Sequence, residues 1–150
     1  SYLGLGTSAA SMLTAPEYDM LAEQNTSLPP RPQDAARARL VVLDSPRKIA
    51  EGTSLFSTEF DVEFLTHREA VAEDLMLHAR LMEPISPALL NESERVFGAP
   101  SMQKVLDSCL HDELLEYVNN EDSKDKTTYR PTEKGWLLGN ELYGRLWDLR

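Results

Sequence analysis

The chain has 150 residues, of which 41% are apolar and 27% charged, and this is the size and composition of one ordinary globular domain. Fifteen Lys and Arg against 25 Asp and Glu give a net charge of -10, whereas a phosphate-binding surface needs clustered positive charge, so the composition argues against nucleic acid as a partner. No apolar run approaches the ~20 residues of a membrane span, and the single cysteine, Cys109, excludes an internal disulfide framework and an iron–sulfur cluster held by this chain alone.

The first residues do not resemble a signal peptide, because they have no basic region and no apolar core before a cleavage site. Tyr2 to Gly6 is apolar and punctuated by glycine, which predicts a strand. Such an opening is more typical of the end of a larger unit than of a natural start. We therefore interpret residues 1–12 as the last strand of a larger preceding part.

Residues 13–65 predict an irregular connecting arm with short strand and helix pieces. Leu28 to Pro32 is polyproline-like and does not suit a helix or sheet interior. Arg39 to Leu43 is a short β-branched run, and Ser45-Pro46 predicts a capped helix that reaches about Glu51 and ends at Gly52. Asp61 to Leu65 alternates charged and apolar residues, as an extended segment does.

Residues 66–150 are periodic almost throughout, and they begin with three predicted helices. Thr66 and Glu69 form a capping box ahead of a helix over about 67–82. Ser86-Pro87 starts a second helix that Gly98 ends. Ser101 is expected to cap a third helix, which runs to Leu110.

A two-stranded ribbon and a last helix follow. Leu114–Val118 and Lys126–Arg130 flank the turn-rich Asn119–Asp125, which predicts a hairpin with a polar tip. Thr132 then caps a helix with one ridge of leucines beside a ridge of aromatic residues: Leu138, Leu142, Leu146 and Leu149, and Trp136, Tyr143 and Trp147. Its three glycines, which weaken a helix, indicate close approach to another backbone: Gly135, Gly139 and Gly144.

Three helices followed by a hairpin is the element order of a winged helix-turn-helix. The predicted fold class is α+β: a mainly helical winged helix-turn-helix domain with a two-stranded wing and an added C-terminal helix, preceded by an irregular arm. We expect residues 66–130 to form the core of this domain, so the terminal helix docks elsewhere. Its apolar surface then packs on the arm, on a missing N-terminal part, or on a second copy of the chain as a homodimer.

Three segments resemble the oxygen-independent coproporphyrinogen III oxidase family, which comprises radical SAM oxidases and HemW-like haem chaperones. Residues 65–77, with Leu65-Thr66-His67-Arg68-Glu69, resemble the opening of the family's C-terminal domain. Residues 132–142, with Thr132-Glu133-Lys134-Gly135, are similar to its closing motif. Residues 2–11 are similar to the glycine-rich strand that ends its barrel, although the family usually has a His where this chain has Ala10.

The resemblance implies a cytoplasmic parent protein whose partial (β/α) barrel binds a [4Fe-4S] cluster and S-adenosylmethionine and acts on a porphyrin or carries haem. It implies that 1–12 is the last barrel strand, and that the missing N-terminal barrel is the partner of 66–150. This chain would itself contain no cofactor and no catalytic residue. Its own role would be structural: to cover the barrel, help enclose the substrate, and exclude water.

The candidate cofactor-binding residues are Gly4, Gly6 and Ala9. Their spacing mimics a dinucleotide fingerprint, but the strand that should precede it is lacking. The two glycines either let a ligand approach the backbone or fit a crowded strand end. Cys109 and the three histidines are of the types that bind haem, but Cys109 lies on an apolar helix face, and no two histidines have a metal-binding spacing: His67, His78 and His111.

Two other classes of function remain open. A winged helix that reads DNA places its third helix in the major groove, but helix 101–110 carries Lys104 as its one cation and also Asp107. The other class is a protein-interaction module that binds no ligand, since acidic winged helices also serve as docking platforms and fold alone does not define function.

Overall fold

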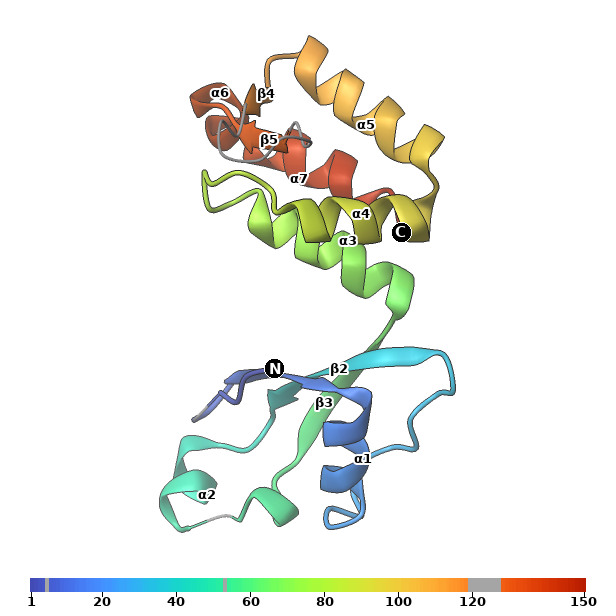
Figure 1. The fold of residues 1–150 in the computed structure, drawn as a ribbon. Helices are drawn as coiled ribbons and strands as arrows, with labels where there is room; N and C mark the ends of the chain where they lie inside the picture. Colours follow the sequence, from blue (N-terminus) through green and yellow to red (C-terminus); the bar gives the residue numbers. More distant parts are fainter. Residues whose placement is uncertain (5, 53, 119–127) are drawn as a thin grey trace. The chain divides into compact units, whose positions relative to one another are not determined.

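The computed structural model describes residues 1–4, 6–52, 54–118 and 128–150 (Figure 1). The fold class is α+β: among the described residues are seven α-helices, a three-stranded antiparallel sheet and a two-stranded antiparallel hairpin. The chain divides into two compact units, unit 1 (Ser1–His67) and unit 2 (Arg68–Arg150). No helix among the described residues is long and apolar enough to cross a membrane.

Unit 1 consists of a sheet with one helix packed against it. Its elements in chain order are β1 (Ala10–Thr14), α1 (Ala15–Ala22), β2 (Ala35–Val42), α2 (Pro46–Ala50), a short 3-10 helix (Leu55–Ser57) and β3 (Phe60–Thr66). The strand order is β1-β2-β3, with β2 in the centre and both pairings antiparallel. One sheet face and α1 bury a small apolar core: Leu13, Tyr18, Leu21, Ala38 and Leu40.

The prediction of an irregular arm over 13–65 is therefore wrong, because this segment holds most of a folded sheet with its own core. The missed helix α1 has the same start signal that identified the helix after Thr66. The Glu17 carboxylate accepts hydrogen bonds from Thr14 N (2.8 Å) and Thr14 Oγ1 (2.7 Å), and Pro16 lies in the first turn. The expected helix after Ser45 is confirmed as α2, with Ser45 Oγ accepting from Lys48 N.

The predicted strand over 2–6 is also corrected. Among the described residues of this segment, only Tyr2 forms a β-bridge, to Met12, and the regular strand starts at Ala10. The chain reverses between them because Gly6 (φ 106°) and Ser8 (φ 57°) adopt positive φ. Residues 1–4 thus lie beside β1 instead of forming a separate strand.

Unit 2 follows the predicted order of three helices, a hairpin and further helix (Figure 1). Its elements are α3 (His67–His78), α4 (Pro87–Phe97), α5 (Ala99–His111), β4 (Leu115–Val118), β5 (Thr128–Pro131), α6 (Glu133–Leu137) and α7 (Gly139–Trp147). The antiparallel hairpin β4–β5 is confirmed, with Leu115 opposite Pro131. The predicted polar tip, Asn119–Asp125, lies outside the described residues.

Several helix boundaries differ from the prediction. Helix α3 ends at His78 instead of residue 82, where Met82 already has a positive φ of 57°. Helix α5 starts at Ala99, directly after Gly98 (φ 84°), because Pro100 fits a first helical turn and Ser101 is not the cap. The Ser86 cap is confirmed, since its hydroxyl accepts from Leu89 N at 3.3 Å.

The last helix is not an appendage, which corrects the prediction that it docks elsewhere. It is broken at Leu138 into α6 and α7, and the leucines of α7 lie in the main core of unit 2 with those of the other helices. Leu142 and Leu146 are fully buried, and Leu149 is 6% exposed. Residues 66–130 therefore do not complete this core without α7.

The three glycines of this region have different roles. A Cβ on Gly135 would lie 2.0 Å from the carbonyl oxygen of Leu114, so the predicted close approach to another backbone is confirmed there. At Gly139 a Cβ would instead meet the ring of Tyr143, at 2.5 Å. Nothing lies within 4 Å of a Cβ on Gly144, and the prediction is wrong for that residue.

Candidate functional site

The predicted cofactor-binding residues, Gly4, Gly6 and Ala9, lie on one turn that leads into β1. The turn is held by backbone hydrogen bonds from Ala9 N to Gly6 O (3.2 Å), from Ser8 N to Val42 O (3.1 Å), and from Val42 N to Ala9 O (3.1 Å). Gly4 N donates to Ser11 Oγ at 3.1 Å. Three N–H groups of the turn, on residues 4, 8 and 9, thus already have acceptors within the chain.

Gly4 also has a steric reason to be glycine. A Cβ at this position would lie 2.3 Å from the carbonyl oxygen of Ala10, a contact that real Cβ atoms do not make. The packing of the chain on itself therefore accounts for Gly4 without a ligand. Gly6 is accounted for by its positive φ, since a Cβ there would meet nothing within 4 Å.

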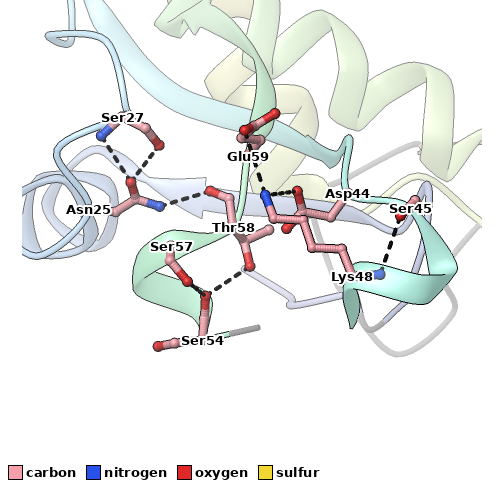
Figure 2. A network of polar contacts seen from close by, with 9 residues as sticks. All are labelled: Asn25, Ser27, Asp44, Ser45, Lys48, Ser54, Ser57, Thr58 and Glu59. Atoms are coloured by element: carbon pink, nitrogen blue, oxygen red, sulfur yellow. Dashed lines mark hydrogen bonds and ion pairs between the residues drawn. The ribbon is translucent and has the colours of Figure 1, made fainter. Parts of the chain in front are cut away.

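A polar network in unit 1 holds the connections that follow α1 and β2 (Figure 2). Asn25 is 1% exposed; its Nδ2 donates to Thr58 O (3.0 Å), and its Oδ1 accepts from Ser27 N (3.0 Å) and Ser27 Oγ (2.6 Å). Thr58 Oγ1 donates in turn to Ser54 O at 3.0 Å. Each of these bonds satisfies a group within the chain, so the Asn25 part of the network stabilises the fold and presents no reactive atom.

The other part of the network centres on the buried carboxylate of Asp44. Its Oδ1 lies 2.7 Å from Nζ of Lys48, which also lies 3.6 Å from Glu59 (Figure 2). The hydrogen bond to Asp44 raises the pKa of Lys48. Because the ammonium already neutralises the carboxylate, this pair is a structural ion pair and not a vacant cation site.

The candidate haem ligands of unit 2 do not converge. Cys109 is fully buried in the core, and this burial raises the pKa of its thiol, so it is an unreactive packing residue. His67 and His111 are exposed, while His78 is half-buried with Nε2 2.9 Å from Pro84 O. Within the described parts of the chain, no three His, Cys, Asp or Glu residues are grouped as a metal ion requires.

These residues do not fit the iron–sulfur cluster that the family resemblance implies for the parent protein. Such a cluster needs several accessible thiolates, and the chain offers one buried thiol with a raised pKa. Any cluster chemistry in a parent protein would therefore use residues outside this chain.

Each unit has an exposed apolar surface among its described residues. In unit 1 a groove of about 460 Å³ lies beside α1, lined by Ser1, Tyr2, Leu3, Leu13, Glu17, Met20 and Leu21. In unit 2 three consecutive residues at the end of α6 are exposed: Trp136 (52%), Leu137 (67%) and Leu138 (47%). We call these three residues the α6 apolar surface. Trp147, in contrast, is half-buried against the core.

Sequence reasoning identified Trp136 and Leu138 as apolar helix residues but did not separate them from the buried leucines. The signal that could have done so is the pair of glycines, Gly135 and Gly139, which flank the surface and favour a break in the helix. Comparison of the chain with protein-family models, with curated proteins and with solved structures returned no match.

Proposed function

We propose that this chain is the C-terminal part of a radical SAM protein similar to the oxygen-independent coproporphyrinogen III oxidases and HemW-like haem chaperones. In this proposal unit 2 is a winged helix-turn-helix domain, with β4–β5 as its wing and α7 as an additional core helix. The chain performs no catalysis. It covers the barrel of the parent protein, helps to enclose a porphyrin or haem, and keeps water from the reaction site.

The observation that carries the proposal is the ordered set of three sequence segments, at 2–11, 65–77 and 132–142, and each segment forms a structural junction. The first makes the glycine turn and β1, and the second leads from β3 into α3. The third makes the Thr132 cap, where Thr132 Oγ1 accepts from Gly135 N (2.9 Å) and donates to Glu113 O (2.6 Å). Each of the three segments therefore has a structural role in the fold.

The α6 apolar surface is the contact region that we assign to the parent barrel. Trp136, Leu137 and Leu138 are adjacent, and large exposed apolar side chains that are grouped together usually mark a binding surface. In the turn before it, Thr132 anchors the backbone to the residues that precede β4, because Thr132 N donates to Leu114 O (3.1 Å) and Thr132 Oγ1 donates to Glu113 O (2.6 Å). A firmly held apolar surface suits a domain that docks permanently on a larger part of its own protein.

A second function, an independent protein-interaction module, is favoured by the same surface together with the acidic charge. The predicted recognition helix α5 has Lys104 as its one Lys or Arg, and Asp107 accepts a hydrogen bond from Gln103 (2.7 Å) on its exposed side. A surface of this kind opposes DNA binding, because phosphate contacts require several cations. In this alternative the partners of the α6 apolar surface are therefore proteins.

Sequencing the gene around this chain gives the first test. We expect the open reading frame to encode a Cys-x3-Cys-x2-Cys motif upstream of Ser1. The full product, purified without oxygen, should hold a [4Fe-4S] cluster, while the 150-residue chain reconstituted alone should show no stable iron–sulfur absorbance. A reading frame without this motif would contradict the proposal and leave the independent interaction module.

Hydrogen exchange tests the covering role. In the full-length protein, backbone amides of 135–138 should exchange more slowly than in the 150-residue chain, because the barrel shields the α6 apolar surface. The exposed helix α2 serves as the internal control, since no contact is assigned to it. Equal exchange of 135–138 in the two proteins would contradict the assigned contact even if the cluster motif is present.

A further inference from the structure

The two edges of the unit 1 sheet differ in how their backbone groups are satisfied. At the β1 edge, Tyr2 N donates to Met12 O and Met12 N donates to Tyr2 O, both at 3.0 Å. Residues 1–4 thus cover part of that edge. The opposite edge is β3, which pairs only with β2 in the described sheet (Figure 1).

The register shows which groups of β3 point away from the sheet. Leu43 N donates to Glu59 O at 2.9 Å, and Val41 and Arg39 lie opposite Asp61 and Glu63 in the same register. In an antiparallel pair, every second residue directs its N–H and C=O to the same neighbour. Residues 59, 61 and 63 therefore bond to β2, whereas the N–H and C=O groups of Phe60, Val62 and Phe64 point outward.

The outward groups have no backbone hydrogen-bond partner among the described residues. A row of unpaired N–H and C=O groups is a template for one more strand. The side chains of the same three residues are half-buried and pack at the margin of the unit 1 core. An added strand would extend this apolar face with its own alternate side chains.

The other face of β3 carries the exposed carboxylates of Asp61 and Glu63, two residues apart. Glu63 forms an ion pair with Arg39 on the neighbouring strand. Side chains directly opposite on adjacent strands interact, so the residues of an added strand opposite these two carboxylates should be basic. The required pattern is apolar-basic-apolar-basic-apolar.

A second copy of the chain does not meet this requirement. In every antiparallel register of two β3 strands that pairs at least two of the outward residues 60, 62 and 64 with each other, Asp61 lies opposite Asp61, Asp61 lies opposite Glu63, or Glu63 lies opposite Glu63. Like charges directly opposite are destabilising. The acidic residues therefore disfavour self-association at this edge.

We propose that β3 is a docking edge for an extended segment of a partner protein in which two basic residues alternate with apolar ones, and that this segment adds as a fourth strand. Backbone hydrogen bonds to Phe60, Val62 and Phe64 supply affinity, and the two acidic side chains select basic partners. This inference does not depend on the proposed parent protein.

The test uses the 150-residue chain and the capped peptide Ser-Val-Lys-Val-Lys-Val-Ser. We expect the backbone amide resonances of Phe60, Val62 and Phe64 to shift on titration and their hydrogen exchange to slow. One control peptide has the same composition with the two lysines adjacent, and the other has Glu in place of each Lys. Both should bind more weakly than the lysine peptide. Equal binding of all three peptides, or no change at these amides, would overturn the proposal.

Two changes separate the charge contribution from the backbone contribution. Asp61→Lys should weaken binding of the lysine peptide roughly three- to tenfold and strengthen binding of the glutamate peptide. The matched control Glu23→Lys, at the exposed end of α1, should change the affinity for neither peptide. Methylating the backbone nitrogens of the peptide that point towards β3 should abolish binding to the unchanged protein. This experiment does not depend on a protein variant that folds. Self-association that depends on protein concentration and protects β3 would instead assign the edge to a second copy.

Discussion

Truncating Leu146 tests whether α7 belongs to the core of unit 2. Its side chain is fully buried, together with Leu142 and the core residues of α3, α4 and α5. Leu146→Ala removes three carbon atoms, which forfeits about 2.4 kcal/mol at about 0.8 kcal/mol per methylene. The cavity left in a packed core brings the expected loss of unfolding free energy to about 3–4 kcal/mol.

Urea denaturation followed by tryptophan fluorescence measures this loss. Both tryptophans of the chain, Trp136 and Trp147, are in unit 2, so the signal reports on that unit. The matched control is Leu137→Ala, because Leu137 is 67% exposed and its truncation should change stability by less than about 0.5 kcal/mol. If Leu146→Ala prevents folding, Leu146→Val should still show a loss of about 1 kcal/mol.

A loss below about 1 kcal/mol for Leu146→Ala, similar to that of the control, would refute this reasoning. It would mean that α7 is an appendage whose leucines are not part of the core. Amide spectra of unit 1 should stay unchanged in both variants, because their substitutions lie outside its core.

Three further outcomes are expected. Gly135→Ala should lower the free energy of unfolding by about 1–3 kcal/mol in the same denaturation assay, because the new Cβ would collide with the Leu114 carbonyl. Alanine favours helix more than glycine does, so increased stability would contradict the close approach. Carbon NMR should show the Glu17 carboxyl titrating with a pKa of about 2, lowered chiefly by the hydrogen bond from the Thr14 backbone N–H. The contribution of this carboxylate to stability is therefore complete above pH 4.5 and is lost as the pH falls towards 2. A titration midpoint near 4.5 would show that the cap is absent in solution. Duplex DNA should not be retained in a mobility-shift assay at physiological salt, because the chain has a net charge of -10; salt-sensitive binding at micromolar concentration would favour a DNA-binding regulator.

The local sequence determined the helix starts that depend on hydrogen bonds within one turn. The Ser45, Ser86 and Thr132 caps form as predicted, because each hydroxyl reaches a backbone N–H three residues ahead. The hairpin was also predictable, since two short strand patterns flank a turn-rich segment close by in the sequence.

The candidate site was less predictable. The glycine pattern at 4–9 showed that the backbone needs room there, but it did not distinguish a ligand from the chain itself. The structure shows the carbonyl of Ala10 where a side chain of Gly4 would be. That contact forms only when the chain reverses at Gly6 and Ser8, which is a property of the folded turn.

Tertiary structure alone decided the unit 1 sheet and the place of α7. Strand β2 pairs with β1 and β3 across long loops, and strand pairing at that distance depends on burial of a shared face, not on a local signal. The leucine ridge of α7 was visible in the sequence, but a ridge does not specify its partner. Leu142 and Leu146 became core residues because the break at Leu138 and the contact of Gly135 with Leu114 bring α7 onto the other helices.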